Sequence, residues 1–328
     1  MTLQEALLAK LKSHLSDHLK LADELGDLLD ISTDSAYRRL RGETSLSIDE
    51  VAIICSKYRI SFDSLLNDKP GIATFHYNPL FAGEMNFESY LLLILGMLQK
   101  MQQTKGEIIY AAEDVPVIRS LSYPRLAQFK IYYWLKSVLN DNTITQNQFE
   151  LGILPEKYNA ICDQIRIAYN QVSSVEIWTE ETLYSTLKQI EFFWQTGKFK
   201  SKDDAMSVWE DMCLVVNDLK MAAENETKDP DMQNGTTFKL YDCEVLVGNN
   251  CIILQAGSWK RTFISYNSMN SLNTEDEAFN DEASQWMQNL IKKSSLMSGV
   301  GEKHRFRFFK LMSDRLQHTL DVLNSDPF

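Results

Sequence analysis

The 328-residue sequence lacks the patterns that identify most membrane proteins and disulfide-stabilised proteins. Its five cysteines are scattered, form no C-x-x-C pair and have no histidine at metal-ligand spacing. They therefore predict buried thiols in a reducing cytoplasm. The longest apolar run, near residues 91–95, is far shorter than a membrane span, and the first fifteen residues are amphipathic rather than signal-like. We expect a cytoplasmic protein that does not bind membranes.

Histidine is also scarce, with five residues, and the common catalytic motifs are missing. The sequence contains no H-E-x-x-H, no G-x-S-x-G and no G-x-x-x-x-G-K-[ST]. His14 and His18 are four residues apart, a spacing that can hold a metal ion, but no third ligand is fixed beside them. We predict two surface histidines, no metal site, no cofactor and no enzymatic activity.

A net positive charge, which most nucleic-acid-binding proteins carry, is missing as well. The formal net charge is −12, and residues 1–70 contain nine lysines and arginines against twelve acidic residues. Any attraction to DNA must therefore be local, at the three arginines Arg38, Arg39 and Arg41. This predicts modest nonspecific affinity with strong salt dependence.

Residues 21–66 carry the strongest functional pattern in the chain. Leucines at helical spacing predict a helix over 21–30, and the Ser, Thr and Asp that follow are typical helix-capping residues. A short helix over 35–41 stops at Gly42, a residue type favoured after helix ends. A third helix starts after a serine and ends near Tyr58. Helix, tight turn and short helix together predict a helix-turn-helix that reads DNA.

The short helix buries the small residue Ala36 and, four positions on, Leu40. Its other side presents hydroxyl and guanidinium groups, which bind guanine edges and phosphate oxygens. We predict base or phosphate contacts by Tyr37, Arg38 and Arg41, and phosphate contacts by Thr33 and Ser35. Arg39 is left out of this set because it lies beside the buried face, where it can pair with an acidic neighbour.

The sequence STDSAYRRLRGE at residues 32–43, followed by SIDE at 47–50, resembles the Cro/repressor-like helix-turn-helix class. It is more similar to the N-terminal domains of Bacteroidetes-type transcriptional regulators, over about residues 3–66. The resemblance implies a DNA-binding domain followed by a larger sensor domain. The segment from Ser294 to Phe309 is similar to the C-terminal region of the same regulators.

Pro70-Gly71 is the clearest break in the chain and ends the helical region. We predict a multidomain protein with an all-α helix-turn-helix domain over 1–69, a linker over 70–82, and a helix-rich α/β or α+β domain over 83–328. The patterns of the third part alternate between long helices and short strands.

Five segments of the C-terminal part have strand-like composition. They are residues 107–112, 174–178, 237–247, 251–255 and 260–266. Gly248, Asn249 and Asn250 tolerate positive φ, so they predict a β-hairpin that joins the third and fourth segments. Helices are expected over 276–295 and 302–323, and residues 225–235 are expected to form an exposed loop.

Two further features leave alternatives open. Ser298–Gly301, before a helix that carries three basic residues, is either an anion site or a linker between helices. The aromatic pairs Tyr132–Trp134 and Phe192–Trp194 either line a ligand pocket or belong to the core.

The sequence thus favours a homodimeric transcription regulator that binds double-stranded DNA and responds to an unidentified small-molecule effector. A two-fold dimer would place two reader helices about one helical turn apart on a palindromic operator. The alternative is a protein-interaction adaptor, whose helical domain docks a partner chain while the acidic body repels nucleic acid. The overall charge favours the adaptor, and the Tyr/Arg helix favours the regulator.

Overall fold

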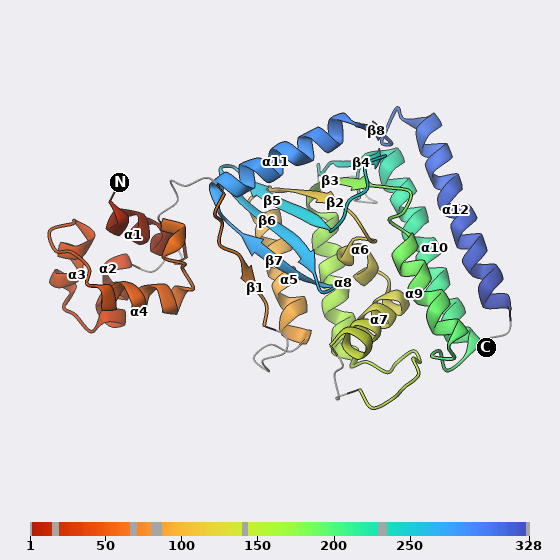
Figure 1. Cartoon of the computed structure of the whole chain (residues 1–328), viewed down its shortest axis with the longest axis horizontal. Coiled ribbons are helices and arrows are strands. Elements are labelled where there is room, and N and C mark those ends of the chain that lie inside the picture. Colours follow the sequence, from red (N-terminus) through yellow and green to blue (C-terminus); the bar gives the residue numbers. More distant parts are fainter. Residues whose placement is uncertain are drawn as a thin grey trace. The chain divides into compact units, whose positions relative to one another are not determined.

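The computed structural model divides into two compact units, Met1–Thr74 and Phe75–Phe328 (Figure 1). It describes residues 2–14, 20–65, 71–79, 87–139, 144–228 and 235–325. The division falls inside the range 70–82, which the sequence predicts as a linker. His18 and the side chain of His14, the predicted surface histidines, lie outside the described residues.

The N-terminal unit is all-helical in its described residues. Its elements are α1 (Leu3–His14), α2 (Leu21–Leu29), α3 (Thr33–Leu40), α4 (Ile48–Tyr58) and the 3-10 turn η1 (Asp63–Leu65). Each α-helix contributes apolar side chains to one small core, which contains Leu7, Leu11, Leu25, Ala36 and Ile54. Each helix has a narrow row of apolar residues that faces this core, so polar residues on its other faces are exposed.

Side-chain caps fix where α3 and α4 begin. The hydroxyl of Ser32 accepts from the backbone N–H of Ser35 at the start of α3. Ser47 and Glu50 form a capping box at the start of α4, in which each side chain bonds the other residue's backbone N–H. Gly42, just beyond α3, has a φ of +75°. The local sequence thus determines both helix starts and the stop after α3.

The C-terminal unit is a helix-rich α/β domain, as the sequence predicts, built on a mixed eight-stranded sheet with the order β1-β7-β6-β5-β2-β3-β4-β8. Its strands are β1 (His76–Tyr77), β2 (Glu107–Ala111), β3 (Ser173–Trp178), β4 (Phe238–Cys243), β5 (Cys251–Ala256), β6 (Trp259–Tyr266), β7 (Asn270–Thr274) and β8 (Ser294–Leu296). Its helices are α5 (Phe87–Gln103), α6 (Val117–Leu121), α7 (Pro124–Tyr133), the π-helix η2 (Trp134–Val138), α8 (Glu156–Asn170), α9 (Tyr184–Gln195), α10 (Lys202–Asn225), α11 (Glu277–Lys292) and α12 (Glu302–Asn324). Among the described residues, no helix is both long enough and apolar enough to cross a membrane.

The sheet lies between two unequal helical layers. Side chains of β2 alternate, so that Ile108 and Tyr110 join the core with α5–α10 and α12, while Ile109 and Ala111 join a smaller core with α11. Figure 1 shows α11 on one side of the strands and α5 and α8 on the other. Burial on both faces explains why β2 and β3 read as nearly continuous apolar segments.

The predicted hairpin at residues 248–250 is wrong. Strand β4 pairs in parallel with β3 and antiparallel with β8, whereas β5 pairs with β2 and β6. Two strands, β2 and β3, therefore separate the segments that the turn residues were expected to join. Turn residues permit a hairpin but do not enforce one. Here the helices between β2 and β3 and between β3 and β4 bring these strands together in parallel, and β5 pairs on the other side of β2.

Several short elements were not predicted. Strand β1 falls within the expected linker, β7 follows the last predicted strand, and β8 replaces the end of the expected helix 276–295. The expected exposed loop 225–235 is also partly wrong, because α10 extends to Asn225 and Lys228 is buried. Residues 229–234 of that loop lie outside the described residues.

Candidate nucleic-acid interface and ligand cavity

Helix α3 and its cap carry all five residues that the sequence assigns to DNA contact. Buried Ala36 anchors α3 in the core, so the opposite side of the helix is exposed. Thr33, Tyr37, Arg38 and Arg41 are exposed, while Ser35 is half-buried and accepts from the Ser32 hydroxyl at 3.0 Å. We call Thr33, Ser35, Tyr37, Arg38 and Arg41 the α3 surface. It combines two guanidinium groups, a phenol and two hydroxyl groups.

Arg39 does not share this surface, and instead ties α3 to α4. Its Nη2 lies 2.6 Å from Oε1 of Glu50, and its Nη1 donates to the carbonyl oxygen of Ser35 at 3.2 Å. Partial burial acts to raise the pKa of the Glu50 carboxyl, but the hydrogen bonds from Arg39 and from the Ser47 backbone lower it overall. The ion pair therefore has a structural role, as its place beside the buried face suggested.

Glu43 pairs with both arginines of the α3 surface. Its Oε1 lies 2.6 Å from Nε of Arg41, its Oε2 accepts from Nη2 of Arg41 at 3.1 Å, and Nε of Arg38 is 3.9 Å away. The hydrogen bond from Arg41 lowers the pKa of the Glu43 carboxyl, which is therefore ionised at neutral pH. All three side chains are about half exposed, so water and salt screen these pairs.

Gln4 of α1 holds the loop that follows α3. Its Nε2 donates to the carbonyl oxygens of Arg39 at 2.8 Å and Thr44 at 3.0 Å, and its Oε1 accepts from the N–H of Leu46 at 2.9 Å. One amide thereby satisfies three backbone groups between α3 and α4. Sequence reasoning missed Gln4 because its partners lie about 40 positions away, and nothing local marks it.

The C-terminal unit contains a cavity of about 510 Å³ at the end of the sheet where β2 finishes. We call it the β2 cavity. The chain leaves β2 through Glu113 and Asp114, and the segments before β5 and between β6 and β7 close the same end. Strands β3 and β4 follow on one side of β2, whereas β5, β6 and β7 follow on the other side, so the strand order changes direction here. Such switch points are where open α/β sheets bind ligands.

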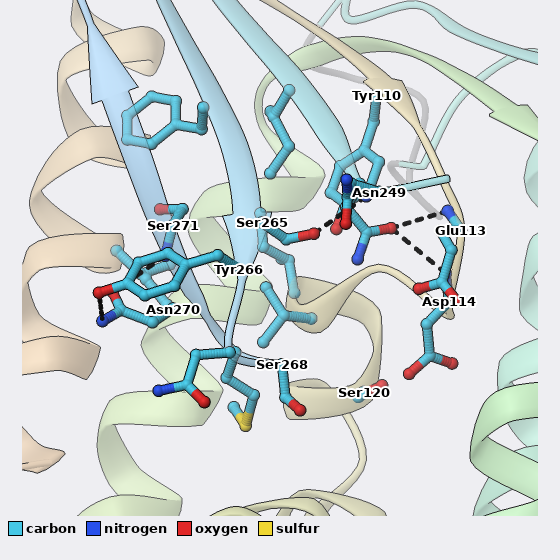
Figure 2. A pocket seen from close by; sticks show the side chains of 18 of the residues that line it. Tyr110, Glu113, Asp114, Ser120, Asn249, Ser265, Tyr266, Ser268, Asn270 and Ser271 are labelled. Atoms are coloured by element: carbon cyan, nitrogen blue, oxygen red, sulfur yellow. Dashed lines mark hydrogen bonds between the residues drawn. The ribbon is translucent and has the colours of Figure 1, made fainter. Parts of the chain in front are cut away.

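The cavity has apolar walls and polar ends. Apolar walls come from α5 and from the covered face of the sheet, including Ile94, Met97, Ile108, Leu254 and Phe263. Figure 2 shows Glu113, Asp114 and Asn249 to one side, and Tyr266, Asn270 and Ser271 to the other. The segment 248–250, predicted as a hairpin turn, is thus part of a cavity wall.

The β6–β7 connection at the rim has an uncommon backbone. Asn267 and Ser268 both have positive φ, 55° and 65°, although neither is glycine. The carbonyl oxygen of Asn267 accepts from Nε1 of Trp134, the first residue of the π-helix η2. Both features occur preferentially at functional sites in proteins. Trp134 lines the cavity, whereas its predicted pair Tyr132 is buried in the aromatic core.

Comparison with known proteins places the N-terminal part of the chain. Residues 7–86 match the BetR domain. The BetR family is associated with helix-turn-helix-like regulators of Bacteroidetes. The match covers about a quarter of the chain and includes the whole α3 surface. No curated protein and no solved structure matches the chain.

The core of the C-terminal unit contains a cluster of charged side chains that no sequence pattern indicated. The fully buried carboxylate of Glu176, on β3, accepts from Nε of Arg119 at 2.8 Å, from Nε1 of Trp178 at 2.8 Å and from the hydroxyl of Tyr169. Burial acts to raise the pKa of Glu176, but the charge and hydrogen bonds of Arg119 lower it overall. The Nζ atom of Lys228 lies 3.2 Å from the ring centre of Tyr169.

Lys228 is the residue of this cluster whose burial lowers the stability of the folded chain. Its Nζ is buried and has no hydrogen-bond partner within the part of the chain that the structure describes. Burial lowers its pKa well below the ordinary value, although the Glu176 carboxylate acts in the opposite direction. The cluster is thus an ion pair of Arg119 and Glu176 beside an amine that folding forces out of water.

Ser298–Gly301 connects elements rather than presenting a free anion site. The Ser298 hydroxyl accepts from the backbone N–H of Leu240, and Nη1 of Arg305 donates to the carbonyl oxygens of Met297 and Gly299. The carboxylate of Glu226 lies against Gly299, where it would repel an anion. The second aromatic pair is divided, with Phe192 exposed and Trp194 buried.

Proposed function

We propose that the protein is a transcription regulator whose N-terminal unit binds double-stranded DNA through the α3 surface. The observation that carries the proposal is the exposure of Tyr37, Arg38 and Arg41 together on one side of a short helix anchored by Ala36. Guanidinium groups suit guanine edges and phosphates, and hydroxyl groups suit phosphates. The BetR match over residues 7–86 supports the same role.

The preceding elements suit a helix-turn-helix. Three residues, Asp30, Ile31 and Ser32, connect α2 to α3, and Asp30 ends α2 with a left-handed φ of 53°. In such motifs the second helix enters the major groove while the first crosses the backbone. We infer that α3 is the reading helix, and that a homodimer presents two copies to an inverted repeat with half-sites roughly 34 Å apart.

The test is selection of bound sequences from random duplex DNA by the full chain at physiological salt. The variant Tyr37→Ala/Arg38→Ala/Arg41→Ala removes the largest groups of the α3 surface. A matched control, Lys12→Ala/Lys57→Ala, removes the same number of cations from exposed positions on other helices of the unit. Circular dichroism and thermal unfolding establish that all proteins are folded.

The proposal expects an inverted repeat that the native chain and the control enrich and the triple variant does not. Enrichment of the same repeat by the triple variant would show that another surface reads DNA. A repeat without inverted symmetry would contradict the dimer. No enrichment by any protein would favour the adaptor, the second candidate, which the net charge of −12 supports.

A further inference from the structure

A buried polar group without a partner borders the β2 cavity. Ser120 of α6 lines the cavity and is fully buried, yet its hydroxyl has no hydrogen-bond partner among the described residues. A buried hydroxyl without a partner costs free energy, because it loses its bonds to water. Its oxygen is closed to solvent, so a molecule in the cavity bonds this hydroxyl only after the side chain rotates toward the cavity.

The cations around the β2 cavity are already neutralised. Nζ of Lys130 donates to Asp114, Thr186 and Gln189, each at 3.0 Å, which uses all three of its N–H groups. The other cation of the lining, Arg261, is paired with Glu275. An anionic ligand would therefore find no guanidinium or ammonium group of the lining free to bind it.

Glu113 is the lining carboxylate that remains available. Its side chain makes no hydrogen bond or ion pair with the residues that the structure describes, and only its backbone N–H is engaged, by Asn250. Partial burial, together with the nearby Asp114, raises the pKa of Glu113. Since Glu113 marks one end of the cavity in Figure 2, that end favours hydrogen-bond donors and disfavours negative charge.

We propose that the β2 cavity binds a largely apolar small molecule that carries hydrogen-bond donors and no negative charge. Its donors face Glu113, and its apolar body lies between α5 and the sheet against Ile94, Ile108 and Phe263. The volume of about 510 Å³ lies within the usual range of small-molecule sites, which are mostly apolar with a few placed polar groups. That this molecule is a transcriptional effector rests on the proposed function, but its binding does not.

A matched pair of fluorescent probes tests the class of ligand. N-phenyl-1-naphthylamine is neutral and carries one N–H donor, and 8-anilinonaphthalene-1-sulfonate adds a sulfonate to the same rings. Each probe is titrated into the full chain without DNA, so the outcome is independent of DNA binding. We expect saturable binding of one neutral probe per chain, with the anionic probe weaker by about tenfold, as expected for one uncompensated carboxylate nearby.

Two variants locate the site. Leu93→Trp places a large ring at the cavity lining, whereas Leu92→Trp makes the same change at the next, similarly exposed position of α5, outside the lining. We expect the first to weaken the neutral probe by about tenfold, the equivalent of about 1.4 kcal/mol, and the second to change it less than twofold. Because both leucines are exposed, both variants should fold like the native chain.

The charge argument has its own variant. Glu113→Lys should make the anionic probe bind at least as well as the neutral one, while Glu282→Lys, an exposed site on α11, should preserve the preference. Thermal unfolding checks that both variants fold. The proposal is overturned if the neutral probe shows no saturable binding, if Leu93→Trp and Leu92→Trp behave alike, or if Glu113→Lys leaves the preference unchanged.

Discussion

Replacing Glu43 by glutamine should strengthen DNA binding. The Glu43 carboxylate accepts two hydrogen bonds from the Arg41 guanidinium, from Nε at 2.6 Å and from Nη2 at 3.1 Å. Its Oε2 lies 3.9 Å from Nε of Arg38. A phosphate that binds these arginines must displace Glu43 or accept its repulsion. Glutamine keeps the shape and removes the charge, so both arginines become available to DNA.

The size of the effect follows from the exposure of the three groups. Their side chains are 49 to 56% exposed, so the attraction between Glu43 and the arginines is largely screened, and the repulsion of a phosphate is modest. One charge at such a distance in a water-like dielectric corresponds to a change in affinity of about threefold to tenfold. Because the pKa of Glu43 is lowered, mild acidification does not mimic the substitution.

The assay is fluorescence anisotropy with a labelled duplex from the selection, repeated between low and physiological salt. Tighter phosphate contact by Glu43→Gln should also steepen the salt dependence, by about 0.9 in the log–log slope for each phosphate newly neutralised. Asp63→Asn, which makes the same charge change on η1, is the control. If both variants bind DNA equally well, the α3 surface is not the interface and the reasoning fails.

Three further predictions concern side chains that affect the stability of the two units. Gln4→Ala should destabilise the N-terminal unit by about 1–3 kcal/mol and weaken DNA binding, because the Thr44 carbonyl and the Leu46 N–H lose the bond from Gln4 and the Arg39 carbonyl keeps only its backbone partners. Glu176→Gln should lower the free energy of unfolding by about 3–5 kcal/mol, because it leaves the Arg119 charge buried and uncompensated. Lys228→Met should stabilise the protein at neutral pH by about 1–3 kcal/mol, because it removes a desolvated amine that has no hydrogen-bond partner among the described residues.

Each of these has a measurement that can contradict it. Chemical denaturation gives the free energies of unfolding, and Gln4→Glu, which places a carboxylate oxygen against the carbonyl oxygens of Arg39 and Thr44, should destabilise the unit at least as much as Gln4→Ala. The folded pKa of Lys228 is lowered, so the native chain gains stability as pH rises toward the unfolded value of 10.5. The advantage of Lys228→Met should therefore shrink with rising pH, and a constant advantage would refute the cause. The folded pKa of Glu176 is also lowered, so its contribution should be lost only as pH falls through that value, below 4.5.

Much of the N-terminal unit could be predicted from sequence because its signals are local. Serine caps, the glycine after α3 and leucines at helical spacing determine where the helices begin, end and face. The same periodicity predicted that Tyr37, Arg38 and Arg41 are exposed, whereas Ser35, assigned to the same surface, is half-buried. Glu43 lies within the motif quoted from the sequence, but its ion pairs with Arg38 and Arg41 are visible only in the structure.

The C-terminal unit was harder to predict because its pairings are non-local. Strand composition indicated β2, β3, β4, β5 and β6, but nothing in residues 244–250 shows that the chain crosses to the far side of β2. Short strands such as β1 and β8 carry too few residues for a pattern. The β2 cavity combines residues from α5, α6, β2 and the β6–β7 connection, so no segment of the sequence contains its signature.

An acidic protein can bind DNA if its cations are free where the DNA lies and its carboxylates act elsewhere. At physiological salt, interactions beyond about 8 Å are largely screened, so the net charge of −12 matters less than the charges around α3. There, Arg39 pairs with Glu50, and the ion pairs that Arg38 and Arg41 make with described residues are with the exposed Glu43. If the proposed function holds, such a surface would attract nonspecific DNA weakly, because few phosphates are neutralised, and would depend on direct contacts with the right sequence. The acidic composition would thereby favour discrimination between sites over affinity for any duplex.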